Sequence, residues 1–183
     1  MATRSATSSI PEGIFPVRRL GRKGGGKFPV ITVARIDERL IHGQVAYAWT
    51  VAYKSEIIMV VDDEVAKDQF QVSLLQMACP AGVKCAVCGV DRGAELLKKH
   101  EARKIFVVVK HPRTLLELHE RGVKIPEINV GGLYFKEGRR QLSKTVYVDA
   151  EMEEIFHKLH DAGIALENRT HPNDGKEDLM KLL

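Results

Sequence analysis

A histidine lies close to two arginines and two carboxylates in the stretch from Arg35 to Val45, which reads RIDERLIHGQV. His42 directly precedes a glycine and follows Arg39 by three residues. An imidazole is nucleophilic near neutral pH, and a guanidinium offers a planar fork of donors that matches phosphate oxygens. The stretch therefore contains the groups that a phosphoryl carrier needs. A structural histidine beside surface Arg/Asp pairs is the alternative interpretation.

The segments on either side place this histidine at a junction between a strand and a helix. Residues 28–34 (FPVITVA) form an apolar run that is typical of a strand. Residues 45–53 are apolar on nearly every face, which favours a buried helix. His42 would then lie just beyond the carboxyl end of the first strand.

Apolar strands and helix-like segments alternate along the whole chain. We expect strands at 30–34, 57–61, 83–88, 105–109, 127–130, 145–148 and 164–167, and helices at about 43–53, 64–78, 91–100, 112–121, 150–162 and 174–182. The alternation predicts a three-layer α/β fold, with a mainly parallel open sheet of about seven strands and helices on both faces. Residues 127–148 lack a helix-length crossover, and a turn at 136–139 predicts a hairpin and one antiparallel edge strand.

Several polar side chains follow the predicted strands. Asp62 and Asp63 follow the second strand, Lys110 and His111 follow the fourth, and residues 129–132 close the fifth. In open sheets of this type, ligands bind beyond the carboxyl ends of the strands. We therefore expect these segments to meet His42 in one pocket.

The charge of the chain is concentrated at its N-terminus. The 183 residues carry a net charge of +4, but residues 1–27 hold six basic groups and one acid, so the remaining 156 residues are close to neutral. We interpret residues 1–27 as a disordered basic extension (a linker, a misassigned start or an expression remnant) and residues 28–183 as one domain. The basic groups do not cluster with aromatic residues, which argues against nucleic-acid binding.

Composition also bears on metals and compartment. Cys85 and Cys88 have the spacing of a zinc or redox pair, but they lie in a predicted strand, where residues three apart face opposite sides. We expect free thiols, no metal and no disulfide framework. Without an export signal or a run of roughly 18–20 apolar residues, the chain is expected to be cytoplasmic.

The stretch from Arg35 to Val45 resembles the phosphorylation-site motif of the IIB subunits in the mannose/fructose/sorbose family of bacterial sugar phosphotransferase systems. Further segments that match are Asn129–Gly132, Ser143–Val146 with Val148–Asp149, and Asp62–Glu64. The resemblance extends over roughly residues 29 to 183.

This resemblance implies a protein-phosphohistidine–sugar phosphotransferase that needs no cofactor. His42 would accept a phosphoryl group from a phosphorylated IIA protein and pass it to a sugar held by the membrane IIC/IID subunits. The protein would then work at the inner membrane through those subunits. The family motif has its arginine three residues before the histidine, so it favours Arg39 over Arg35 as the residue that stabilises phosphate charge.

Other residues receive roles from their chemistry and position. Asp37 either orients Arg39 or the imidazole, or is a solvated turn carboxylate. The predicted helix start supplies backbone N–H groups that favour an anion. The predicted phosphate-binding residues are Gly43, Gln44, Lys110, Asn129 and Gly131.

Two other functions fit parts of the sequence. The alternative is a non-catalytic α/β sensor that binds a sugar phosphate or another anion reversibly. An ATP-dependent kinase is less consistent, because Gly21–Lys27 resembles a nucleotide-binding loop but Phe28 replaces its hydroxyl residue. Neither the sugar nor the oligomeric state follows from the sequence, and a homo-oligomer is compatible with it.

Overall fold

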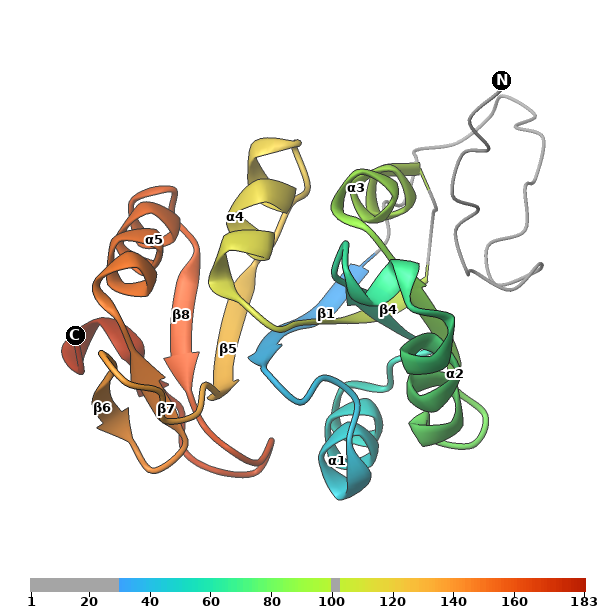
Figure 1. Cartoon of the computed structure of the whole chain (residues 1–183), viewed down its shortest axis with the longest axis horizontal. Coiled ribbons are helices and arrows are strands. Elements are labelled where there is room, and N and C mark those ends of the chain that lie inside the picture. The colour runs from blue at the N-terminus through green and yellow to red at the C-terminus, as the bar shows by residue number, and fades with distance from the viewer. Residues whose placement is uncertain (1–29, 100–102) are drawn as a thin grey trace.

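A mainly parallel sheet forms the centre of the molecule (Figure 1). The computed structural model describes residues 30–99 and 103–183, so the predicted extension at 1–27 lies outside the described residues. The strands, in spatial order, are β3 (Lys84–Cys88), β2 (Ile57–Val61), β4 (Lys104–Val109), β1 (Val30–Asp37), β5 (Glu127–Gly132), β8 (Ala165–Asn168) and β9 (Glu177–Asp178). Neighbouring strands pair in parallel except β9, which is antiparallel to β8 at the edge.

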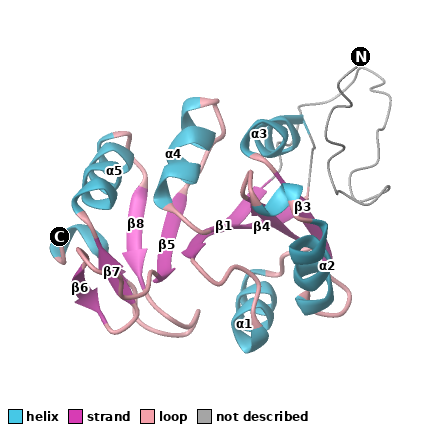
Figure 2. Cartoon of the chain, in the orientation of Figure 1, coloured by secondary structure: helices cyan, strands magenta, loops and turns pink. Residues whose placement is uncertain are grey.

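Helices cover both faces of this sheet, as the sequence predicts (Figure 2). One face carries α1 (Gly43–Tyr53) and α2 (Gln69–Ala78), and the other carries α3 (Val90–Lys99), α4 (Pro112–Glu120) and α5 (Ala150–Asp161). The buried apolar side chains accordingly form two clusters. Cys85 packs in the cluster under α1 and α2 and Cys88 in the cluster under α3, α4 and α5, so the two thiols face opposite sides of β3 as expected.

The predicted helix at 64–78 is interrupted. A 3₁₀ helix, η1, spans Val65–Lys67, and Asp68 then starts α2 by accepting hydrogen bonds from the backbone N–H groups of Phe70 and Gln71 at 3.0 and 3.1 Å. An aspartate that caps a helix in this way satisfies donors that have no partner within the helix. The side chain of Asp68 therefore sets the start of α2.

The helix expected at 174–182 was a wrong prediction. Glu177 and Asp178 instead form β9, which pairs with Asn168 and Glu167 of β8, and only a 3₁₀ helix, η2, remains at Leu179–Lys181. Strand β8 would otherwise leave its backbone groups unpaired at the edge of the sheet. This pairing overrides the local preference of the segment for a helix.

A hairpin forms between residues 127 and 148, but its turn lies at 144–145 and not at the expected 136–139, and it stands apart from the main sheet. Strands β6 (Arg140–Ser143) and β7 (Val146–Val148) form a separate antiparallel pair. The turn at 136–139 leads into β6, with the Arg139 backbone N–H donating to the carbonyl oxygen of Lys136 at 3.1 Å. The antiparallel edge strand of the main sheet is therefore β9.

The chain reverses its direction of winding between β1 and β5, which are neighbours in the sheet. After β1 the chain crosses through α1 to β2, on the β4 side. After β5 it continues through the hairpin and α5 to β8, on the opposite side. Adjacent strands whose connections diverge in this way define the topological switch point where open α/β sheets bind ligands.

No helix in residues 30–99 or 103–183 combines the length and the apolar character needed to cross a bilayer.

Candidate functional site

A five-residue turn, Glu38–His42, joins β1 to α1 at the switch point (Figure 1). Leu40 in this turn has a φ of 58°, in the left-handed region that residues other than glycine rarely adopt. Its side chain is buried with Ile41 in the core beneath α1, and this packing holds the unusual backbone in place. His42 then stands at the N-cap position of α1, with 20% of its side chain exposed.

Glu38 anchors the other side of the turn to the segment after β5. One carboxylate oxygen accepts from the backbone N–H of Tyr134 at 3.1 Å, and the other accepts from Lys136 Nζ and Arg139 Nη1, both at 2.8 Å. Partial burial alone would raise the pKa of Glu38, but the hydrogen bonds from Lys136 and Arg139 hold that pKa below its ordinary value. The turn is thus fixed by the core on one side and by ionic contacts on the other.

The imidazole of His42 is oriented by Asp37. Nε2 of His42 lies 3.1 Å from Oδ2 of Asp37, and Oδ1 of Asp37 accepts from the backbone N–H of Arg39 at 3.1 Å. The Asp37 side chain is only 1% exposed, so it is not the solvated turn carboxylate of the second interpretation. Because a carboxylate can only accept, this hydrogen bond requires a proton on Nε2, and in the neutral ring Nδ1 is then the nitrogen with a free lone pair.

Arg35 lies behind Asp37, away from solvent. Its side chain is 2% exposed, and Nη2 donates to Oδ2 of Asp37 at 2.9 Å while Nη1 donates to Oδ1 of Asn129. The guanidinium also stacks over the ring of Trp49, with Cζ 5.0 Å from the ring centroid. Burial lowers the pKa of Arg35, and the charge of Asp37 opposes that change. Arg35 can therefore act on His42 only through Asp37.

Two glycines of β5 make room for this ion pair. A Cβ added to Gly131 would lie 2.0 Å from Nη1 of Arg35, and one added to Gly132 would lie 2.6 Å from Oδ1 of Asp37. Any side chain at either position would displace the charged groups of β1. The glycines thus serve the site through close packing of β5 against β1.

The start of α1 is open to an anion. Gly43 and Gln44 are exposed, the N-cap residue His42 makes no side-chain capping bond, and the first turn contains no acidic residue. The first N–H groups of a helix lack partners within the helix and carry a partial positive charge. Arg39 is exposed beside them, with its Cζ 5.1 Å from the ring centroid of Tyr134.

The predicted residues do not all meet in one place. Asn129 is fully buried behind Arg35, and Lys110 lines a hollow with η1 and the start of α2. Asp62 and Asp63 accept hydrogen bonds from backbone N–H groups of Val65 and Val90, at 2.9 Å in each case. The switch point therefore gathers residues from β1, α1 and β5, while Asp62 and Asp63 bind the first residues of η1 and α3.

His111 also has a local role. It is the N-cap residue of α4, and its Nδ1 accepts from the backbone N–H of Arg113 at 3.2 Å. Burial lowers the pKa of this imidazole. The neutral form that accepts this hydrogen bond is therefore favoured.

Four residues near the site were missed in the sequence. Trp49 and Tyr53 of α1, Glu167 of β8 and Arg169 just beyond it are linked to Asn129 and Arg35. The only signal in the sequence is an acid and a base two residues apart at the carboxyl end of a strand. Such a pair is more often a solvated surface pair.

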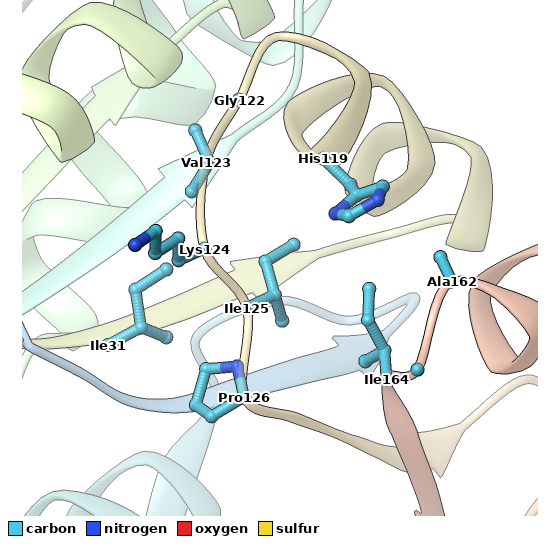
Figure 3. A pocket seen from close by; sticks show the side chains of 10 residues that line it. Ile31, His119, Gly122, Val123, Lys124, Ile125, Pro126, Ala162 and Ile164 are labelled. Atoms are coloured by element: carbon cyan, nitrogen blue, oxygen red, sulfur yellow. The ribbon is translucent and has the colours of Figure 1, made fainter.

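A second hollow lies at the amino ends of the strands, opposite the end that carries His42 (Figure 3). This cavity of about 550 Å³ is lined by Ile31 at the start of β1, by residues 122–126 before β5 and by Ala162–Ile164 before β8. It opens at the amino ends of the strands and presents mainly apolar side chains, with His119 at its rim (Figure 3). Its position separates it from His42, which lies beyond the carboxyl end of β1.

Within the described residues, no group of three or more His, Cys, Asp or Glu side chains is placed to hold a metal ion.

Comparison with known proteins agrees with this geometry. The family described as the PTS system sorbose subfamily IIB component matches residues 31–183. The sorbose-specific EIIB component of Lacticaseibacillus casei is 35% identical over 153 residues, covering 82% of this chain and 93% of that protein. The mannose-specific EIIAB component of Escherichia coli K12 is 39% identical over 162 residues, covering 87% of this chain and 50% of that protein.

Solved structures show the same fold. The crystal structure of the IIBSor domain of the sorbose permease from Klebsiella pneumoniae has a TM-score of 0.79 and 30% sequence identity, with 83% of this chain and 94% of that chain covered. The matching family and fold belong to proteins that carry phosphoryl groups in sugar phosphotransferase systems. The chain belongs to the IIB components of the sorbose subfamily.

Membership of this family establishes the general activity. IIB components are phosphotransferases that carry phosphoryl groups in sugar uptake, so the expected function and enzyme class are confirmed. The alternative, a non-catalytic sensor that binds an anion reversibly, is not favoured by these relatives.

Proposed function

We propose that His42 carries the phosphoryl group and that Nδ1 is the atom that bonds to phosphorus. The observation that carries this proposal is the contact between Nε2 of His42 and the buried carboxylate of Asp37 at 3.1 Å. That contact keeps the proton on Nε2 and leaves the lone pair of Nδ1 for attack. The ring is also partly exposed, as a carrier that meets two successive partners requires.

The transfer step needs no proton to move. The lone pair of Nδ1 forms the new P–N bond, and the electron pair of the old bond returns to the nitrogen of the donor phosphohistidine. The His42 ring, which now bears phosphorus on Nδ1 and hydrogen on Nε2, acquires positive charge. Asp37 stabilises that charge through the same hydrogen bond.

Charge on the phosphoryl oxygens is stabilised from two directions. Arg39 is exposed on the turn and can present its fork to two oxygens, while the backbone N–H groups of Gly43 and Gln44 face an anion at the start of α1. Arg35 and Gly131 act indirectly: Arg35 holds Asp37, and Gly131 leaves room for the guanidinium of Arg35. Asn129 also acts indirectly, and we assign it to the support of Arg35.

The partners follow from the class of protein. A phosphorylated IIA protein is the donor, and the membrane IIC/IID subunits present the sugar that accepts the group. The EIIAB name of the E. coli relative, of which this chain matches half, supports a IIA donor. We also propose that residues 28–183 form a single domain that works at the cytoplasmic face of the membrane, while self-association stays a prediction.

The test is to incubate the protein with the phosphorylated IIA donor and to locate the modification by mass spectrometry. The wild-type chain should gain one acid-labile, base-stable phosphoryl group on His42, and His42→Ala should gain none while keeping its fold. His157→Ala, which removes an exposed imidazole of α5, is the matched control and should be modified like the wild type. Full modification of His42→Ala would show that another residue is the carrier.

A further inference from the structure

Buried polar side chains continue behind the site from β5 into β8. Asn129 is 0% exposed, Glu167 4% and Arg169 8%, and the polar partner of the His42 side chain is Asp37 rather than any of these three. Burial of polar and charged groups costs free energy unless each finds a partner. Their partners in this structure lead, one after another, to Arg35 and Asp37.

Asn129 connects Arg35 of β1 to Glu167 and Arg169 at the end of β8. Its amide oxygen accepts from Nη1 of Arg35, and its Nδ2 donates to Oε1 of Glu167 at 3.0 Å and to the carbonyl oxygen of Arg169 at 3.1 Å. With the amide turned over, its NH₂ group would face the guanidinium, and two donors would oppose each other. The acceptors on the β8 side therefore decide which way the amide of Asn129 points.

Arg35 depends strongly on that orientation. Its Nε atom is buried without a hydrogen-bond partner in the described structure, so the guanidinium is held chiefly through Nη1 and Nη2. The guanidinium itself fills the space where any other residue at position 131 would have a Cβ. If Asn129 ceased to hold Nη1, the guanidinium could turn, and its Nη2 bond to Asp37 would lose alignment.

Arg169 fixes Glu167 and closes the network against α1. Its Nε donates to Oε1 of Glu167 at 2.9 Å, Nη1 donates to the carbonyl oxygen of Pro172 at 2.6 Å, and Nη2 donates to the hydroxyl oxygen of Tyr53. The ring of Trp49 packs against both arginines, with Cζ of Arg169 at 4.9 Å and Cζ of Arg35 at 5.0 Å from its centroid.

We propose that Glu167 and Arg169 are positioning residues for phosphoryl transfer at His42, acting through Asn129 and Arg35 on the carboxylate of Asp37. This proposal rests on the role of His42 given above. It predicts that residues which never touch phosphate still set the rate, because a displacement of about 1 Å at the nucleophile can lower a rate by about 100-fold.

The test compares Glu167→Leu, which removes the side-chain acceptor of Asn129 and leaves only the carbonyl oxygen of Arg169, with Glu167→Gln, which keeps an oxygen at the Oε1 position. Single-turnover transfer from the phosphorylated IIA donor should be about 10- to 100-fold slower in Glu167→Leu, with the donor concentration for half-maximal rate unchanged. Glu167→Gln should stay within about threefold of the wild type, since its oxygen can accept both hydrogen bonds.

A second readout needs no phosphate. In the unphosphorylated protein labelled with ¹⁵N-histidine, the Nε2–H signal of His42 should be protected from exchange by Asp37. Glu167→Leu should lose that protection, and Glu167→Gln should keep it. If Glu167→Leu does not fold, the double variant Glu167→Leu/Arg169→Leu, which removes both charges, is measured in its place.

Glu127→Leu is the matched control. It breaks an ion pair with Lys176 at the other end of β5, so transfer and the His42 signal should be unchanged. A wild-type rate and signal in Glu167→Leu, or equal losses in Glu167→Leu and Glu167→Gln, would overturn the positioning role. If wild-type His42 took no phosphate, the proposed function would fail, and the Nε2–H signal would still decide whether Glu167 positions the ring.

Discussion

In the proposed mechanism, the reactivity of His42 depends on the contrast between its two ring nitrogens. Nε2 faces a carboxylate that is 1% exposed, whereas the ring as a whole remains 20% exposed. A buried acceptor on one side and access on the other distinguish this imidazole from an ordinary surface histidine. The two arginines also differ in exposure: Arg39 is exposed at the turn, whereas Arg35 is buried and donates to Asp37.

Arg39→Lys should slow transfer more than it weakens binding of the donor. An ammonium keeps the charge but cannot offer two parallel N–H donors to the phosphoryl oxygens, so we expect single-turnover rates about 10-fold lower. Rapid-quench measurements over a range of donor concentrations separate the rate from the affinity. Arg113→Lys, at an exposed ion pair with Glu151, is the control, and an unchanged rate in Arg39→Lys would remove Arg39 from the transfer step.

The elements that build the site meet through unusually close contacts. Strand β5 approaches β1 so closely that Arg35 and Asp37 occupy the space where side chains of residues 131 and 132 would otherwise lie. Helix α1 then starts directly after the turn and presents its uncapped end beside His42. The chemistry of the site is therefore as much a property of the glycines in β5 as of the charged residues in β1.

Gly131→Ala should impair transfer without changing any residue that contacts phosphate. The added methyl group would lie 2.0 Å from Nη1 of Arg35, so we expect a loss of about 1–3 kcal/mol in the free energy of unfolding together with slower transfer. Denaturant unfolding and single-turnover transfer measure the two effects. Gly175→Ala, where an added Cβ meets no atom within 4 Å, is the matched control. Wild-type values for Gly131→Ala would mean that Arg35 can move freely.

Elements with a strong apolar pattern could be predicted from the sequence. Helix α1 was expected at 43–53 and occupies Gly43–Tyr53, and β2 likewise matches the expected 57–61. The segment at 174–182 could not be predicted, because its structure depends on pairing with β8, which lies outside the segment. Pairings of this kind are decided by tertiary contacts.

The site could be predicted only in part, for a similar reason. His42 was identifiable from its neighbours along the chain. The burial of Asp37 depends on β5, and the roles of Glu167 and Arg169 depend on β8, strands that lie far away in sequence. Glu167 and Arg169 have the local pattern of a solvated pair, but in the structure Trp49 and Tyr53 contact Arg169, and Asn129 donates to Glu167.

In the molecule as a whole, the turn that carries His42 lies at the carboxyl end of the central strands. The central strands β4, β1 and β5 are buried between the two layers of helices and hold Arg35 and Asp37 in place. Glu38 connects this sheet to the segment before the β6–β7 hairpin through Tyr134, Lys136 and Arg139. Ionic contacts thus join parts of the chain that are about 100 residues apart.

These contacts predict a dependence of global stability on pH. Because the folded state lowers the pKa of Glu38 from its ordinary 4.5, its contribution is complete above pH 4.5 and disappears as the pH falls through the lowered value. Wild type should therefore exceed Glu38→Gln in free energy of unfolding near pH 7, and the difference should vanish in acid. Denaturant titrations across this range measure it. Glu64→Gln, at an exposed ion pair with Lys67, should show little difference at any pH, and a constant gap for Glu38→Gln would contradict the linkage.

The most direct test is to identify the ring nitrogen that bonds to phosphorus. Long-range ¹H–¹⁵N correlation spectra of the phosphorylated, ¹⁵N-histidine-labelled protein distinguish the two isomers of phosphohistidine. The geometry predicts phosphorus on Nδ1 of His42, with hydrogen retained on Nε2 beside Asp37. Phosphorus on Nε2, or on any residue other than His42, would contradict it.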